Sequence, residues 1–528
     1  MRKSESLIQL VNSLSKQEKK EFSCYITNKQ EKDYILLFRL IDDKHLTGAE
    51  ELKQAFLRER PGASFNTSVT YLYNLLIKIL TDLRIEQDSY YLLFNALLHA
   101  RVLYEKAMYE ECFQLLKRIK QKASHYENHF ALLMAQRLEL NYLLALDFGD
   151  VDEKRLLNKQ HKIRNTIKSI NKLNEQSSLY ELLKLRTLNQ DISRSREEVR
   201  KLNDLVTSEI SIVASGTIEN FEIKKNHQLF QANYFIAVGD YKAAFNSFVE
   251  LNRLFEENTH LWNNPPIYYL MTIEGMLESL RIIHDYKGME YFLDKLTKLK
   301  SASAWFLLDV ACIIFTYRLS SAIDQGEFDI ASSLIEENQM TVLERLGLLQ
   351  ESRQAEVVLY TAFVYLGNNE PRKARRLLGA VICKGHLYAH SLFRTIRIMN
   401  LLVCYELGDI DYIQSETRSI KREMAKNKER SLKVERLLLK FLDLSFAVTG
   451  RKKLTEVWRR LEKEAEVLYT DKYEQQILRK IDFMAWIESK VFKKALSEIL
   501  KQRYNKLPYY YDFSKLFMIK WVYISRFF

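Results

Sequence analysis

Helix-breaking residues are scarce in this chain, whose 528 residues include only 14 glycines and 5 prolines. In average proteins these two residue types make up about 7% and 5% of the sequence. Segments with the strict two-residue alternation of a half-buried strand are also missing. So few breakers, together with an apolar content of 47%, indicate helix nearly throughout. The composition therefore predicts a fold of the all-α class.

Cysteines and long uncharged segments are equally sparse. An odd number of cysteines without paired spacing argues against a disulfide framework and for a reducing compartment. No segment reaches the roughly 18–20 uncharged residues that a membrane span needs, and Met1–Ser6 is polar, unlike a secretory signal. We therefore expect a cytoplasmic protein that does not enter a membrane. The cysteines are Cys24, Cys112, Cys312, Cys383 and Cys404.

The common catalytic and cofactor motifs are missing as well. The sequence contains no glycine-rich phosphate loop, no Gly-x-Ser-x-Gly elbow and no His-Glu-x-x-His motif. One cluster has zinc-binding residue types: His386 and His390 would share a helix face, with Cys383 on the preceding turn. A zinc site needs a third or fourth ligand, and only Cys404 lies near in sequence. We expect no metal, no cofactor and no catalytic residue, and a metalloenzyme at this cluster is a minor alternative.

What the chain has instead is a long period. Similar helical hairpins recur about every 42 residues, and a long period repeated many times predicts a solenoid. Glycine suits such a turn because helices commonly end with a residue in the left-handed conformation. The expected turns lie at Ala107, Gly149, Ser193, Gly239, His284, Gly326, Gly367, Gly408, Gly450 and Lys490.

The clearest copy resembles the tetratricopeptide repeat. That family has a small residue and an aromatic residue in the first helix, a Gly-Asp-Tyr turn, and alanine and an aromatic residue in the second helix. The period exceeds the 34 residues of the family, which implies longer helices. The resemblance implies a right-handed superhelical solenoid of about ten helical hairpins. The matching residues are Ala232, Phe235, Gly239, Asp240, Tyr241, Ala244 and Phe248, with weaker matches around Gly326 and Ala107.

The repeats are predicted to cover residues 91–505. Residues 1–90 contain two capping boxes, Ser15–Glu18 and Thr47–Glu50, and are interpreted as a helical N-terminal domain. A helix-turn-helix regulator with 66–84 as its recognition helix is the alternative. It is disfavoured because apolar residues surround most of that helix, as in a buried helix. Residues 506–528 are expected to form a C-terminal capping helix.

The tetratricopeptide resemblance also implies a binding groove, because the first helix of each repeat lines the concave face in that family. Amide and hydroxyl side chains there would suit the N–H and C=O groups of a peptide backbone. The sequence therefore predicts a non-catalytic scaffold, adaptor or regulator that binds a protein or peptide. The expected groove residues are Asn226, Asn233, Gln354, Thr361, Tyr365, Thr395 and Tyr405.

A basic excess supports an alternative function. The formal net charge is +12, and the cations are concentrated at 372–376, 418–440 and 451–453. Such clusters are typical of proteins that bind nucleic acid, where phosphate neutralisation supplies most of the non-specific affinity. They are equally typical of solvated helix faces. The patch residues are Arg372, Lys373, Arg375, Arg376, Arg418, Lys421, Arg422 and Lys426.

Overall fold

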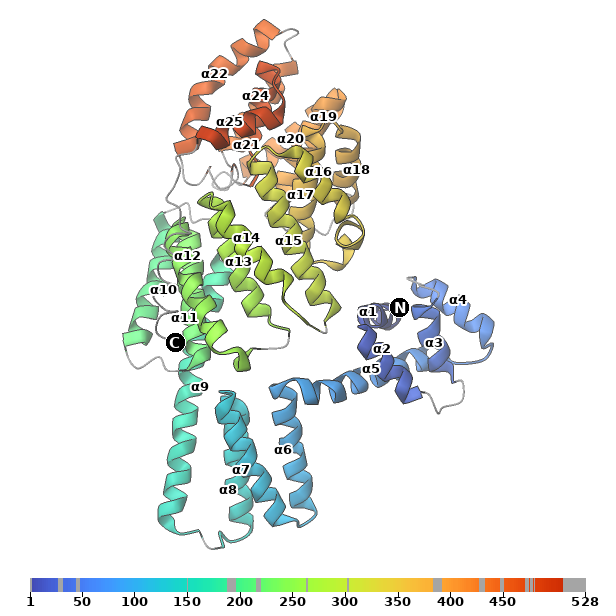
Figure 1. Cartoon of the computed structure of the whole chain (residues 1–528), viewed down its shortest axis with the longest axis vertical. Helices are drawn as coiled ribbons and strands as arrows, with labels where there is room; N and C mark the ends of the chain where they lie inside the picture. Colours follow the sequence, from blue (N-terminus) through green and yellow to red (C-terminus); the bar gives the residue numbers. More distant parts are fainter. Residues whose placement is uncertain are drawn as a thin grey trace.

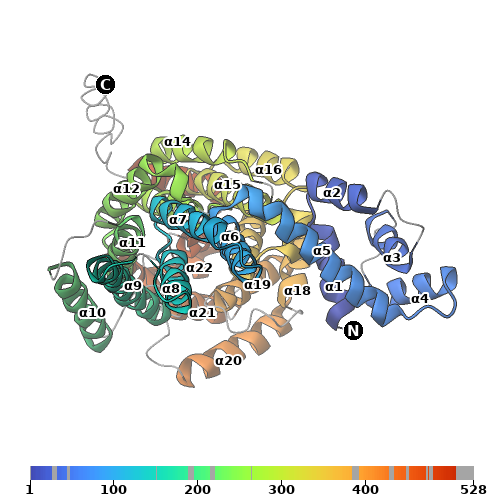
Figure 2. The ribbon, with the colours of Figure 1, turned by 90° about the horizontal axis from the view of Figure 1, so that it is seen from below.

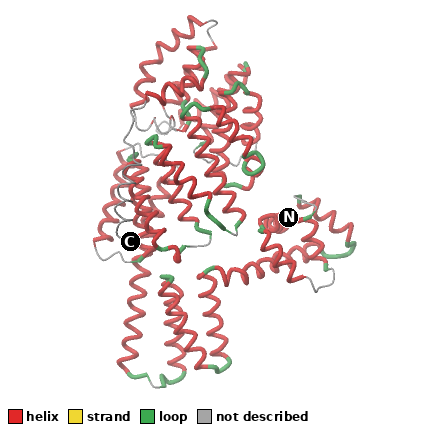
Figure 3. Tube along the Cα trace, in the orientation of Figure 1, coloured by secondary structure: helices red, strands yellow, loops and turns green. Residues whose placement is uncertain are grey.

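The prediction of an all-α fold is confirmed. The computed structural model shows α-helices, two short 3-10 helices and no strand over the residues that it describes (Figure 3). These residues are 2–26, 32–43, 48–149, 151–187, 196–214, 220–262, 265–301, 303–382, 392–426, 433–446, 451–470, 474, 478 and 480–506.

Five helices form an N-terminal bundle that stands to one side of the molecule (Figure 1). Its core packs large apolar side chains such as Phe22, Leu37, Phe56 and Leu72, each fully buried. The last helix continues out of the bundle and packs on the helix that follows it. The helices are α1 (Arg2–Ser13), α2 (Lys16–Ile26), α3 (Asp33–Asp42), α4 (Ala49–Glu59) and α5 (Phe65–Gln87).

The capping box predicted at the start of α2 is present. The Ser15 backbone N–H donates to Glu18 Oε2 at 2.8 Å, and the Glu18 N–H donates to Ser15 Oγ at 3.3 Å. Arg84 near the end of α5 donates to Glu18 Oε1 at 2.7 Å, so the cap also holds α2 on α5. Because Leu72 and Leu76 of α5 are buried in the bundle core, that face of α5 is not available to enter a DNA groove.

The rest of the chain is a series of helices in which each packs on the next (Figures 1 and 2). Helices two apart also touch, as α13 and α15 or α15 and α17 do. The helices are α6 (Ser89–Glu105), α7 (Tyr109–His125), α8 (His129–Ala145), α9 (Glu153–Thr187), α10 (Arg196–Ala214), α11 (Phe221–Val238), α12 (Tyr241–Glu257), η1 (Thr259–Leu261), α13 (Ile267–Ile282), α14 (Tyr286–Thr297), α15 (Ala304–Asp324), α16 (Phe328–Glu337), η2 (Leu343–Leu348), α17 (Glu351–Gly367), α18 (Pro371–Ile382), α19 (Phe393–Leu407), α20 (Ile410–Lys426), α21 (Lys433–Phe446), α22 (Arg451–Thr470), α24 (Phe483–Phe492) and α25 (Leu496–Lys506).

Most predicted turn positions within the described residues adopt a left-handed conformation between two helices. Two predicted turns are displaced: Gly367 closes α17 while Asn369 has φ +60°, and Lys490 lies inside α24 while Lys493 has φ +54°. The predicted turns at Ser193 and Gly450 lie outside the described residues. The turn residues with positive φ at their predicted places are Ala107, Gly149, Gly239, His284, Gly326 and Gly408.

Helix α9 departs from a regular series of hairpins. Its 35 residues contain no glycine or proline, so nothing in its sequence interrupts the helix between the turns expected at Gly149 and Ser193. Its first half packs on α8, where Lys159 pairs with Glu139 at 2.9 Å. Its second half packs on α11, where Asn226 Nδ2 donates to Ser177 Oγ at 2.8 Å. One helix therefore belongs to two successive packing units.

The apolar core follows the chain in separate clusters. The clusters of α6–α8, of α9–α11, of α11–α15 and of α15–α25 succeed one another in sequence. Helix α15 belongs to two of them. It is long and apolar enough to cross a membrane by length and composition, but 67% of its most apolar window is buried by protein. We therefore interpret α15 as a core helix.

The C-terminal hairpin α24–α25 lies against helices far earlier in the sequence. Helix α25 packs on α15, and it approaches the α15–α16 turn so closely that a Cβ at Gly326 would lie 2.5 Å from the Ser497 carbonyl oxygen. Arg281 Nη2 donates to the Lys480 carbonyl oxygen at 3.3 Å, just before α24. The predicted C-terminal capping helix falls almost wholly on residues 507–528, outside the described residues.

Candidate functional site

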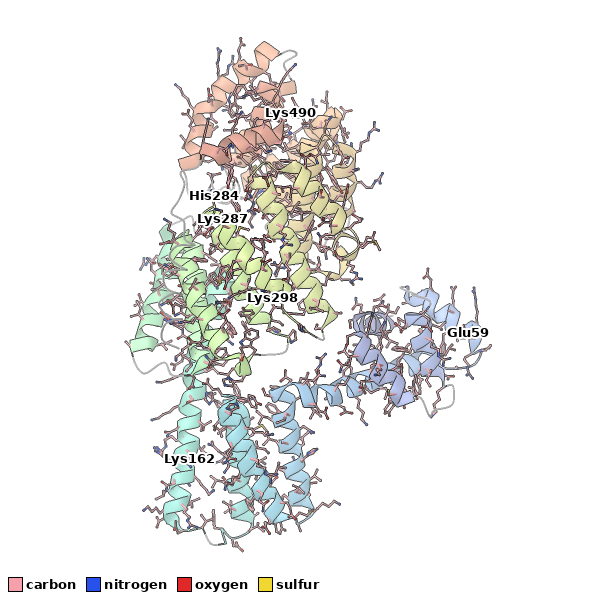
Figure 4. All side chains as sticks on the ribbon, in the orientation of Figure 1. Glu59, Lys162, His284, Lys287, Lys298 and Lys490 are labelled. Carbon is pink, nitrogen blue, oxygen red and sulfur yellow. The ribbon has the colours of Figure 1, made fainter. Side chains whose placement is uncertain are left out.

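A large cavity opens where the C-terminal hairpin meets the turns of earlier hairpins. Its volume is about 1160 Å³. One wall comes from the α11–α12 turn (239–242), the α13–α14 turn (281–284) and Asp324 at the end of α15. The facing wall comes from α24, α25 and the residues just before them. His284, which lies just before α14, belongs to the first wall and is labelled in Figure 4.

Arg281 reaches this cavity from α13 and is only 5% exposed. Its Nε and Nη2 donate to the two carboxylate oxygens of Asp324 at 2.8 and 3.0 Å. Its Nη1 donates to the Tyr360 hydroxyl of α17 at 2.6 Å. Burial alone would lower the pKa of Arg281, but Asp324 keeps it well above its usual value. One fixed cation therefore joins α13, α15, α17 and the chain before α24.

The C-terminal wall has its own ion pairs. Arg503 of α25 pairs with Asp482, and it contacts Glu488 at 2.8 Å. Tyr504 lies with its ring 5.8 Å from that of Tyr286, so aromatic side chains bridge the two walls. These pairs hold α25 on α24 and neutralise the acidic residues at this edge of the cavity.

A row of polar side chains, here called the polar stripe, continues from Arg281 across α13, α15 and α17. Arg353 of α17 donates through both terminal nitrogens to Glu274 of α13, at 2.7 Å for Nη2. Its Nε donates to Asp309 of α15 at 3.1 Å. Tyr317 of α15 donates to Glu278 of α13 at 3.1 Å. The polar stripe comprises Glu274, Glu278, Arg281, Asp309, Tyr317, Asp324, Arg353, Glu356 and Tyr360.

The polar stripe holds charges in surroundings with little water. Burial raises the pKa of Glu356, and the nearby Glu278 and Glu274 raise it further, while Lys480 acts in the opposite sense. Burial would lower the pKa of Arg353, but its bonds to Glu274 keep it above its usual value. Burial raises the pKa of the Tyr360 hydroxyl to about 12. The stripe therefore cross-links helices through charge, and burial raises the pKa of two of its carboxylates, Glu356 and Asp309.

The predicted groove residues do not gather at one surface. Asn226, Thr361 and Thr395 are buried, so a ligand cannot reach their side chains in this conformation. Asn233 and Gln354 donate to backbone carbonyls of Leu229 and Leu349 at 2.7 Å.

Two tyrosines predicted to line the groove are half-buried. The ring of Tyr365 lies 5.6 Å from Lys373 Nζ. The ring of Tyr405 packs edge-on against Trp486 at 5.3 Å. On α17 the inward polar face is made by 353, 356 and 360, whereas the prediction placed 354, 361 and 365 there. The observed face is rotated about the helix axis by roughly one residue, or about 100°, from the predicted face.

The predicted basic patch is only partly free. Lys373 pairs with Glu370 at 2.8 Å, Arg375 pairs with Asp409 at 2.8 Å, and Lys421 pairs with Asp443. The remaining arginines are exposed and form no ion pair within the described part of the chain; they are Arg372, Arg376, Arg418 and Arg422. For Lys426 only the place at the end of α20 is described.

The sequence did carry a signal for the site that the groove prediction missed. Glu274, Glu278 and Arg281 lie four and three residues apart in α13, an otherwise apolar helix. Charges at that spacing share one helix face, and a charge on a buried helix needs a partner. The partners on α15 and α17 could not be assigned from spacing alone.

The described residues contain no group of three histidine, cysteine, aspartate or glutamate side chains that could hold a metal ion. The predicted alternative at Cys383, His386 and His390 lies outside them. No protein-family model matches the chain, and no curated protein matches it either.

Proposed function

We propose that this protein is a non-catalytic helical-repeat scaffold or regulator that binds a peptide segment of a partner protein. In this proposal the hairpins form a right-handed superhelical solenoid of the tetratricopeptide kind, and the partner segment binds where the C-terminal hairpin closes on the hairpin turns. The observation that carries the proposal is the cavity of about 1160 Å³ between these two walls.

The size and lining of the cavity favour a peptide over a small molecule. Pockets for drug-sized ligands have volumes of about 300–1000 Å³ and mostly apolar linings with few polar groups. This cavity is larger, and charged side chains from both of its walls line it. A peptide backbone needs hydrogen-bond partners along its length, and exposed polar side chains of the lining, such as Gln502, supply them in this proposal. The fixed Arg281–Asp324 pair gives the cavity a rigid floor, which lowers the entropic cost of binding.

The direct test uses peptides selected from a random twelve-residue library on the full chain. Their affinity is then measured by fluorescence anisotropy on Gln502→Trp, which places an indole ring in the cavity lining. The matched control is Lys298→Trp, at the end of α14 away from the cavity (Figure 4). We expect at least a tenfold loss of affinity in Gln502→Trp and none in Lys298→Trp. Equal affinity in the two variants, or no selectable peptide, would refute the proposal.

The four exposed arginines without ion pairs favour a second candidate, a regulator that binds nucleic acid through the basic patch. Phosphate contacts release counterions, so such binding falls steeply as salt rises. A labelled single-stranded oligonucleotide titrated between 50 and about 200 mM salt tests this candidate. An affinity that falls as salt rises, with a weaker dependence on salt in Arg372→Ala and Arg376→Ala, would support it. Affinity that does not change with salt would exclude it.

A further inference from the structure

The outer face of α20 carries hydrogen-bond donors around a hollow of about 470 Å³. Ser415, Arg418, Ser419 and Arg422 line it at positions i, i+3, i+4 and i+7, the spacing that places residues on one helix face. All four are exposed, and α20 lies at the edge of the molecule (Figure 2). The face is therefore open to a partner.

The donors on this face are largely free. Arg418 Nε donates to the Gln414 carbonyl of its own helix at 3.1 Å, which leaves both terminal nitrogens available. Arg422 has neither an ion pair nor a hydrogen bond within the described part of the chain. Ser419 Oγ accepts a bond from Arg397 Nη2 at 3.1 Å, so its hydroxyl hydrogen is left to donate to another group.

The one acidic residue in the lining is already paired. Glu423 accepts from Arg397 Nη1 at 2.7 Å, and the same arginine donates to Glu416 at 2.6 Å. Arg397 is largely buried, with 13% of its side chain exposed, and fixes α20 on α19. A face with two guanidinium groups that have no ion pair and two hydroxyls, and with its one carboxylate bonded to Arg397, attracts an anion with several oxygens.

From this geometry we propose that the face of Ser415, Arg418, Ser419 and Arg422 binds a phosphoryl group on a side chain of a protein partner. The inference rests on the proposed function, because it assumes that the partner is a protein. A phosphorylated side chain carries a charge of about −1.5 to −2 and three acceptor oxygens, which two arginines can neutralise. Arginine clusters recognise phosphorylated motifs in this way.

A single phosphoryl group fits better than a nucleic-acid backbone. A nucleic acid needs several phosphate contacts in succession. The cations that would extend the track are occupied: Lys421 pairs with Asp443, and Arg375 pairs with Asp409 at the turn before α20. Among the described side chains of α20 and the turn before it, the arginines without an ion pair are Arg418 and Arg422, which line the same hollow.

The test compares two labelled peptide pools, one with a fixed central phosphoserine and degenerate flanks and one with serine at the same place. Anisotropy is measured on the full chain, on Arg418→Ala and Arg422→Ala, and on Arg372→Ala as an exposed arginine of α18. A twelve-nucleotide oligothymidylate serves as the nucleic-acid probe. We expect at least tenfold tighter binding of the phosphoserine pool, lost in both α20 variants and kept in Arg372→Ala. Arg422→Lys, which keeps the charge but loses the planar fork, should retain part of this preference.

Four results would overturn the inference. They are equal affinity for the two pools, no binding of either pool, an equal loss in Arg372→Ala, and tighter binding of oligothymidylate that is lost in the same α20 variants. If serine and phosphoserine pools bind equally but Gln502→Trp weakens both, the inference fails and the proposed function stands. If neither pool binds and no library peptide can be selected, both fail.

Discussion

Removal of the Arg281 guanidinium should release the C-terminal hairpin from the rest of the protein. In Arg281→Ala the Asp324 carboxylate, whose side chain is 18% exposed, loses both arginine bonds and keeps the Tyr286 hydroxyl at 3.3 Å. The Tyr360 hydroxyl and the Lys480 carbonyl lose the same donor. Breaking a buried ion pair from one side costs about 3–5 kcal/mol, because the other charge stays buried without its partner.

The matched control is Arg318→Ala on α15. Arg318 pairs with Glu290 at 2.5 Å and is 35% exposed, so its loss should cost about 0–1 kcal/mol, as for other surface pairs. Arg281→Met combined with Asp324→Leu should be less destabilised than Arg281→Ala, because it leaves no unpaired charge.

The assay is native-state hydrogen exchange, which reports local opening even where a long helical array does not unfold in one step. In Arg281→Ala the opening free energy of amides in 482–506 should fall by about 3–5 kcal/mol, and in Arg318→Ala by less than about 1 kcal/mol. Equal losses in the two variants would show that Arg281 does not tether the hairpin.

Three further changes test other parts of the structure. Gly326→Ala should destabilise the protein by about 1–2 kcal/mol because of the positive φ at this position, and further because the new Cβ would clash with Ser497. Gly408→Ala, which has open space around it, should show only the cost of the positive φ. Urea titration and proteolysis at α25 would compare the two variants. Glu356→Gln should stabilise the protein at neutral pH. The folded pKa of Glu356 is raised from 4.5, so the wild-type protein loses stability as pH rises from about 4.5 through the folded pKa. The extra stability of the variant over wild type should therefore vanish at lower pH. The same extra stability across that pH range would contradict the raised pKa. Ser15→Ala should cost about 0.5–2 kcal/mol through the lost cap on α2, measured as a fall in the melting temperature of the N-terminal bundle, and no fall would contradict the role of the cap.

Local sequence signals predicted much of the fold. Scarce glycine and proline predicted helix, the Ser15–Glu18 pattern predicted the start of α2, and the turn residues Gly239, Gly326 and Gly408 lie where the period placed them. These features depend on residues close in sequence. The continuity of α9 was missed because the period was extended across a segment whose own residues contain no breaker.

The candidate site was harder to predict because its geometry depends on distant segments. Arg281 and Lys480 are 199 residues apart, and no pattern in either segment indicates that they meet. The rotation of α17 that directs 353 and 356 toward its neighbours is set by packing against α15 and α19. A change of one residue in the assumed face moves a side chain by about 100°, which is enough to place Thr361 in the core.

The most direct test of the proposed function is hydrogen exchange of the full chain with and without a library-selected peptide. If the peptide binds where the two walls meet, amides in 239–242, 281–284 and 496–506 should gain protection, and those of α6–α8 should not change. Protection confined to α6–α8, or to 372–376 and 418–422, would contradict binding in the cavity.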